Sequence, residues 1–167
     1  MQIVDAQSRD HFQAVRRLCW EYRDFLLSLG GTDAEAVLHF YPVEKYARLM
    51  EGLEAEHMAP AGGIKLALQS NTTIGCGMFH TFAPGTAEIK RVYVRQDARG
   101  TGAGRAIMES LVAACRAAGF RRILMDTGRA LTAAQGLYLS MGFRARGPYQ
   151  DLPEELLPLL RFFEMEL

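Results

Sequence analysis

The segment Arg99-Gly100-Thr101-Gly102-Ala103-Gly104-Arg105 lies between a strand-like run, residues 87–95, and a helix-like run that continues to Ala118. Its three glycines occupy alternate positions. A glycine-rich loop at the start of a helix presents free backbone N–H groups and the positive end of the helix dipole to an anion. The segment therefore predicts a loop that binds a pyrophosphate.

The commoner phosphate-binding motifs do not fit this loop. A Walker A loop carries Lys and then Ser or Thr after its last glycine, whereas Arg105 and Ala106 follow here. A G-x-G-x-x-G dinucleotide motif counted from Gly100 would place Arg105 at its last glycine. The loop does fit the pattern Arg-x-x-Gly-x-Gly, which Arg99, Gly102 and Gly104 form.

Upstream of the loop, the pattern of apolar residues predicts a strand, two helices and three antiparallel strands. Ser8 is a candidate N-cap, Gly30-Gly31 ends the first helical pattern, and a polar stretch at residues 32–35 separates the two helices. A turn at residues 70–73 indicates a hairpin. The predicted strands are residues 3–6, 64–69, 74–82 and 87–95, and the predicted helices are residues 8–28 and 42–53.

Downstream, the helix that follows the loop ends at Gly119, and a strand spans residues 122–126. Thr132 and Gln135 have the spacing of a capping box for a short helix, which Gly142 ends. Residues 143–149 and 161–167 predict the last two strands. The expected order is βααβββαβαββ, which is a mixed α/β class.

Length and charge set limits on the class of protein. A chain of 167 residues with 49% hydrophobic composition fits one domain, residues 1–167. Nineteen basic and nineteen acidic residues cancel, so we expect neither nucleic acid nor an anionic membrane as a partner. The first residues lack a signal-peptide pattern and no apolar run has the length of a membrane span, so we expect a cytoplasmic protein.

The cysteines and histidines do not form a recognisable site. Cys19, Cys76 and Cys115 are odd in number and widely spaced, so we expect reduced thiols. Cys76 and Cys115 lie in apolar patterns, which favours core positions over an acyl-cysteine mechanism. The four histidines lack metal-ligand spacing, so we expect no metal; they are His11, His39, His57 and His80.

With these segments in view, the chain resembles the GNAT superfamily of acetyl-CoA-dependent N-acyltransferases. The resemblance rests on the strand segment at residues 88–94, the Arg-x-x-Gly-x-Gly loop, and Leu137-Tyr138-Leu139-Ser140-Met141-Gly142-Phe143. It implies a GNAT fold, a mostly antiparallel sheet of about six or seven strands that is flanked by helices and splayed between strands four and five. Many members carry Asn where this chain has Leu131.

The resemblance implies acetyl-CoA as the co-substrate. Backbone groups of Val92, Tyr93 and Val94 would pair with the pantetheine arm like an added strand. Backbone N–H groups of residues 100–105 would hold the pyrophosphate, with Arg99 preceding them. The side chain of Arg105 either adds charge at the phosphates or lies in solvent.

The resemblance also implies two catalytic residues. Glu88 occupies the position where several members carry a catalytic glutamate, and the amine needs such a group because a pKa of about 10.4 leaves it protonated at pH 7. Glu88 could act directly or through water, or could simply pair with Lys90 or Arg91. Tyr138 matches the tyrosine that points at the cofactor sulfur in many members. A core packing role is its alternative, and full proton transfer from the phenol would be uphill by about 2 kcal/mol. A backbone N–H near Val94 would polarise the acetyl carbonyl.

The expected acceptor is a primary amine of a small molecule or amino acid, with a protein amine as a further option. His39, Tyr41 and Tyr149 are the candidate acceptor contacts, although each could instead serve packing. Acidic residues before the last strand favour a cationic acceptor; they are Asp151, Glu154 and Glu155.

Two other functions remain open at this level. One is an acyl-CoA-binding sensing or structural module without turnover, and the other is a scaffold that binds no CoA. The family often forms homodimers, and Phe162 and Phe163 in the last strand are candidates for such an interface.

Overall fold

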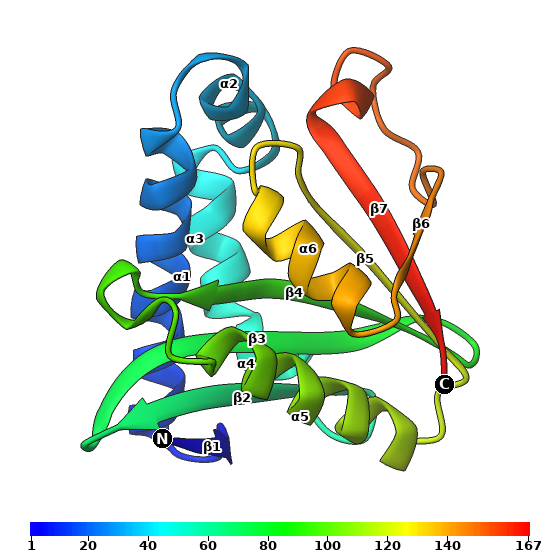
Figure 1. Ribbon diagram of the computed structural model, residues 1–167. Helices are drawn as coiled ribbons and strands as arrows, with labels where there is room; N and C mark the ends of the chain where they lie inside the picture. Colours follow the sequence, from blue (N-terminus) through cyan, green and yellow to red (C-terminus); the bar gives the residue numbers. More distant parts are fainter.

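A computed structural model describes residues 1–167, and Figure 1 shows a twisted sheet with helices on both faces. The strands are β1 (Gln2–Asp5), β2 (Gly62–Gln69), β3 (Thr72–Ala83), β4 (Thr86–Val94), β5 (Arg122–Gly128), β6 (Arg144–Arg146) and β7 (Leu160–Glu166). The helices are α1 (Arg9–Ser28), α2 (Gly31–Phe40), α3 (Val43–Glu51), α4 (Leu53–Glu56), α5 (Ala103–Ala117) and α6 (Thr132–Ser140), with short 3-10 turns η1 (Gln96–Ala98) and η2 (Leu157–Leu159).

The seven strands form one sheet in the order β1-β2-β3-β4-β5-β7-β6. Every neighbouring pair is antiparallel except β4 and β5, which are parallel. This parallel pair is short, because only residues 86–88 of β4 pair with residues 122–124 of β5. Beyond this point the two strands separate. The splay that the family resemblance implies is therefore confirmed, together with the mostly antiparallel α/β sheet.

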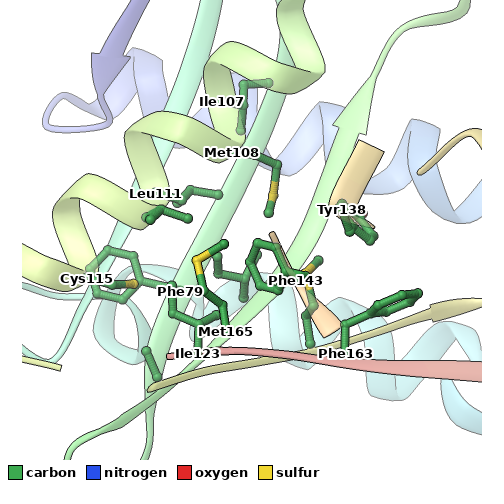
Figure 2. Close-up of a cluster of buried hydrophobic side chains, with 14 of the residues drawn as sticks. Phe79, Ile107, Met108, Leu111, Cys115, Ile123, Tyr138, Phe143, Phe163 and Met165 are labelled. Atoms are coloured by element: carbon green, nitrogen blue, oxygen red, sulfur yellow. The ribbon is translucent and has the colours of Figure 1, made fainter. Parts of the chain in front are cut away.

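Two hydrophobic cores lie on opposite faces of the sheet. On one face, α5 presents Ile107, Met108, Leu111 and Cys115 to residues of the central strands, and Figure 2 shows Tyr138 at the edge of this cluster. On the other face, α1 and α3 pack on β2 and β3.

Several local predictions are confirmed. The backbone N–H of His11 donates to the Ser8 hydroxyl oxygen at 3.1 Å, so Ser8 caps α1 as its sequence position predicts. Ser70 and Asn71 form the hairpin turn with φ of 48° and 62°, values that suit a two-residue turn between β2 and β3. Even α1, the longest of the helices, lacks the apolar length needed to cross a membrane.

The region between α1 and β2 differs from the sequence prediction. The polar stretch expected at residues 32–35 is part of α2, and the single helix expected over residues 42–53 is divided at Gly52 into α3 and α4. Ala36 and Val37 of α2 are buried against the body of the protein, and this tertiary packing outweighs the weak helical signal of Thr32 and Asp33.

Three further details of the C-terminal part differ from the prediction. Leu131, not Thr132, is the N-cap of α6, and Gln135 donates its side-chain amide to the carbonyl oxygens of Gly128 and Arg129 instead of closing a capping box. The strand expected over residues 143–149 is only β6. Phe162 and Phe163, the proposed dimer contacts, are both buried within the chain, so they are not available to a partner.

Candidate active site

A cavity of about 460 Å³ lies where β4 and β5 separate. Residues 89–92 of β4 and 125–128 of β5 line it, and α1, α2 and α3 contribute the wall on one face of the sheet. Tyr138 of α6 also lines it. The separation of two parallel strands therefore opens a cavity in the middle of the sheet, the place where open α/β sheets commonly bind ligands.

The glycine loop leads directly into α5. The backbone N–H groups of residues 100–105 have no acceptor within the protein. Gly100 and Gly102 have φ of 80° and 86°, and a Cβ atom at either position would meet open space. Six free donors at a helix N-terminus, with no side chain over two of them, fit a diphosphate.

Side chains around the loop are turned away from these donors. The Thr101 hydroxyl donates to the Ala98 carbonyl at 2.7 Å, and the Arg99 guanidinium carbon lies 4.3 Å from the centroid of the Phe25 ring. Arg105 donates to the Ser140 hydroxyl at 2.8 Å, which places its charge between α5 and α6. The loop thus offers backbone donors, and Arg105, which the Ser140 hydroxyl holds in position, is a cation of the same segment.

The edge of β4 that faces the splay is unpaired from Ile89 to Val94. Residues 75–83 of β3 pair with the opposite edge of β4, and β5 pairs only as far as Glu88. Those backbone groups of Val92, Tyr93 and Val94 that point to this edge have no partner strand there, although the Val94 carbonyl oxygen accepts from Nε of Arg99 at 3.3 Å. The remaining groups are available to an extended amide-containing ligand.

Glu88 lies at the last paired position before the splay and is only 2% exposed. Its Oε2 lies 2.7 Å from Nε2 of His80 and accepts from Nζ of Lys90 at 3.2 Å. Its Oε1 accepts from the Tyr149 hydroxyl at 2.8 Å and from the Gln150 amide at 2.9 Å. Burial alone would raise the pKa of Glu88, but the hydrogen bond with His80, the charge of Lys90 and the Tyr149 hydroxyl lower it to about 2. The carboxylate is ionised at neutral pH, and four partners already occupy its oxygens.

Tyr138 is 4% exposed and packs against Phe143 and Phe163, with ring centroids 6.1 and 5.7 Å away. Its ring lines the cavity, and its hydroxyl donates to no other protein group. Burial, followed by the charge of Asp126, raises the pKa of the phenol well above its usual range. Tyr138 is therefore a protonated donor with no partner inside the protein, although it is also part of the core.

The candidate acceptor contacts are not all in one place. Tyr41 lines the cavity, and its carbonyl oxygen accepts from Nε of Arg23 at 2.9 Å. His39 is exposed on α2 and does not line the cavity. Tyr149 is also absent from the cavity wall, because its hydroxyl hydrogen-bonds Glu88.

The charged residues of the cavity were not selected as site residues from the sequence; those on the two separating strands are Lys90, Arg91 and Asp126. Asp126 is half-buried and forms no ion pair, and burial raises its pKa, although the nearby charge of Lys90 acts in the opposite direction. Its position near the carboxyl end of a strand parallel to β4 is the signal that could have identified it, because the carboxyl ends of parallel strands share one edge.

The cysteines are all buried thiols. Burial raises the pKa of Cys115 to about 12. The Sγ of Cys76 donates to the Arg91 carbonyl oxygen at 3.7 Å, and Cys76 does not line the cavity. None of the three is therefore placed to act as an acyl-carrying nucleophile in this cavity.

The sequence of this chain is similar to those of known acetyltransferases. Residues 16–143 match the sequence profile of the acetyltransferase (GNAT) family. The chain is 32% identical over 111 residues to an N-acetyltransferase of Schizosaccharomyces pombe and 35% identical over 103 residues to an IAA acetyltransferase of Azospirillum brasilense. These matches cover 65% and 61% of this chain and span 66% of the length of each relative.

A solved structure shows the same fold over the full length. The paiA N-acetyltransferase of Thermoplasma acidophilum, in complex with coenzyme A, superimposes with a TM-score of 0.71 at 14% identity and covers 100% of both chains. The family profile matches residues 16–143 and the fold agrees over the full length, so the chain belongs to the GNAT family of acetyltransferases.

Proposed function

We propose that this protein transfers an acetyl group from acetyl-CoA to a primary amine of a small molecule or amino acid, by direct attack in a ternary complex. The observation that carries the proposal is the cavity in the splay, which is lined by the unpartnered Tyr138 and by the free edge of β4. That edge continues through η1 to the acceptor-free N–H groups at the start of α5.

Acetyl-CoA would bind in an extended form along these features. Backbone N–H groups of residues 100–105 hold the pyrophosphate, and the pantetheine amides pair with Val92 and Val94 on the free edge of β4. This places the acetyl end in the cavity beside Tyr138. The Thermoplasma relative, solved with coenzyme A, supports this ligand.

The reaction requires an amine that has lost its proton. The amine nitrogen bonds to the thioester carbonyl carbon, the C–S bond breaks, and sulfur leaves with the electron pair. Asp126 receives the amine proton, because its carboxylate lines the cavity, has no cationic partner and has a raised pKa. The Tyr138 hydroxyl donates a hydrogen bond or a proton to the departing sulfur.

Glu88 acts indirectly in this scheme. Because His80, Lys90, Tyr149 and Gln150 occupy its oxygens and its pKa is about 2, it is a poor direct base. It keeps Lys90 charged and the wall of the cavity in place, and a proton reaches it only through His80 or water.

The test is thiol release from acetyl-CoA against amines, amino acids and lysine peptides. Acceptor-dependent release that falls about 100-fold in Tyr138→Phe and in Asp126→Asn would support the proposal. The exposed acid Asp24 on α1, which does not line the cavity, supplies a matched control, Asp24→Asn, which should leave the rate unchanged. CoA binding without any acceptor-dependent release would favour a non-catalytic acyl-CoA-binding module, and absence of CoA binding would exclude both functions.

A further inference from the structure

The guanidinium of Arg91 lies in the wall of the cavity without a carboxylate partner. Its Nε is buried and makes no hydrogen bond, and its Nη1 contacts only the Met78 sulfur, at 3.9 Å. It forms no ion pair with any acidic residue of the chain, whereas its neighbour Lys90 pairs with Glu88. The charge of Glu56 acts on Arg91, but no carboxylate lies within ion-pair distance of it. A permanently charged group that is half-buried without a hydrogen-bonded counter-ion is costly, which indicates that a ligand supplies the missing anion.

The backbone is distorted where Arg91 lies. The β3–β4 pairing passes from Met78↔Lys90 to Cys76↔Tyr93, so Gly77 faces two residues of β4. Arg91 is one of these two, and its φ is 52°. This bulge brings Arg91 to the cavity together with Lys90, instead of on the opposite face as strict alternation would require. A positive φ at a non-glycine residue costs on the order of 1 kcal/mol, and strain of this kind gathers at binding sites.

Each of the other basic side chains of the cavity either interacts with protein groups or is exposed to solvent. Arg23 is buried, donates to the Tyr41 carbonyl and lies 5.9 Å from the ring centroids of both Trp20 and Tyr46. Lys45 is exposed. Arg91 is therefore the cation of the cavity that is partly buried and still lacks a partner.

The cavity also contains three acidic residues, which differ in the interactions of their carboxylates. Asp33 lies in the first turn of α2, where the helix dipole stabilises it, and Glu56 lies 3.6 Å from Nδ1 of His80. Asp126 lies at no helix N-terminus and forms no ion pair, and the cationic charge that acts on it is that of Lys90, which already pairs with Glu88. The cavity thus contains one unmatched guanidinium and one unmatched carboxylate.

We propose that the acceptor carries a carboxylate in addition to its amine, and that Arg91 binds this carboxylate. The proposal rests on the acetyl-transfer function above and narrows its acceptor to amino acids and other amino carboxylates. A planar guanidinium matches a carboxylate with two parallel hydrogen bonds, and a single guanidinium balances one negative charge rather than two. The acceptor amine then lies toward Asp126 and Tyr138, and the cavity volume is that of a small-molecule site.

The test compares amines that differ only in this carboxylate: phenylalanine with phenethylamine, lysine with cadaverine, and β-alanine with ethylamine. The wild-type protein should have a kcat/KM at least 10-fold higher for the carboxylate member of the preferred pair. Arg91→Gln should raise the KM of that member about 10- to 100-fold, with kcat within a few-fold and no change for the decarboxylated member. Arg91→Lys keeps the positive charge but loses the two parallel N–H donors, so its KM for the carboxylate member should lie between those of the wild type and Arg91→Gln. Arg48→Gln, at an exposed position of α3 outside the cavity, is the matched control and should leave the KM unchanged.

Calorimetric titration of the same pairs in the presence of CoA gives a readout that does not depend on turnover. The dissociation constant of the carboxylate member should rise in Arg91→Gln, while that of CoA stays constant. Equal affinity of the two members, an equal loss for both, or a weaker affinity for CoA would overturn the proposal. Turnover of decarboxylated amines without any preference would leave acetyl transfer intact and reject only the role of Arg91, whereas absence of turnover with every amine would reject the transfer function itself.

Discussion

The hydroxyl of Tyr149 lies 2.8 Å from Oε1 of Glu88, although the two residues are 61 positions apart in the chain. This hydrogen bond connects the segment between β6 and β7 to the last residue at which β4 pairs with β5. The amide of Gln150 reinforces it at 2.9 Å on the same carboxylate oxygen. The segment before β7 is thereby held at the point where the sheet opens into the cavity.

Glu88→Gln should destabilise the fold as well as slow the reaction. The neutral amide leaves the positive charge of Lys90 half-buried and replaces one of the two accepting oxygens by an NH2 group, so we expect a loss of about 3 kcal/mol in the free energy of unfolding. Urea denaturation measures this loss. Glu54→Gln, which breaks the exposed pair with Arg16, is the control and should cost less than about 1 kcal/mol.

The low pKa of Glu88 also predicts an acid dependence of stability. The folded pKa of about 2 lies below the ordinary 4.5, so the ionised carboxylate stabilises the fold above pH 4.5, and this contribution is lost as the pH falls from 4.5 toward 2. Denaturation between pH 5 and 2 should show a shallower decline for Glu88→Gln than for the wild type. The same decline in both proteins would contradict the assignment.

Tyr138→Phe should separate catalysis from stability. The Tyr138 hydroxyl has no protein partner, so its removal should lower kcat about 100-fold yet change the free energy of unfolding by less than about 0.5 kcal/mol. Tyr46→Phe provides the contrast, since the Tyr46 hydroxyl donates to the Cys19 carbonyl at 2.8 Å and its loss should cost about 1 kcal/mol. A Tyr138→Phe variant that keeps full kcat would restrict this residue to packing.

Gly102→Ala should weaken CoA binding. Gly102 has φ of 86°, and its missing Cβ would enter the open space beside the free N–H groups, where the pyrophosphate is proposed to lie. We expect at least a 10-fold rise in the dissociation constant of CoA by calorimetry. Gly136→Ala, in the exposed part of α6 with open space around it, is the matched control: CoA affinity should be unchanged, and the helix should gain about 0.5 to 1 kcal/mol.

His57 should make the fold sensitive to mild acid. Its Nδ1 lies 2.9 Å from the Phe79 carbonyl, its Nε2 is buried without a hydrogen bond, and burial lowers its pKa from 6.5 to about 4. The unfolded chain therefore takes up a proton first, and stability should fall as the pH drops from 6.5 to 4, by about 3 kcal/mol in total. Thermal melts of His57→Asn should lack this decline, while the exposed His39→Asn should keep it.

The sequence predicted β4 and α6 best. The alternation of residues 87–95 placed Glu88 on a strand, and the short helix around Tyr138 was predicted within a few residues of its observed limits. Both elements depend on residues that are close to one another in the sequence, and the pattern of apolar residues describes such local structure well. By contrast, the helical signal of α2 was too weak to identify, since burial of Ala36 and Val37 against distant elements stabilises that helix.

The sequence by itself determined the glycine loop, the strand and helix on either side of it, and the family to which the chain belongs. The tertiary structure alone decided that β4 and β5 separate after Glu88, that a bulge brings Arg91 to the cavity, and that Asp126 lies there without a partner. The reason is physical: loop and helix signals are local, whereas the meeting of side chains from different strands depends on register, and a one-residue bulge changes which side chains share a face.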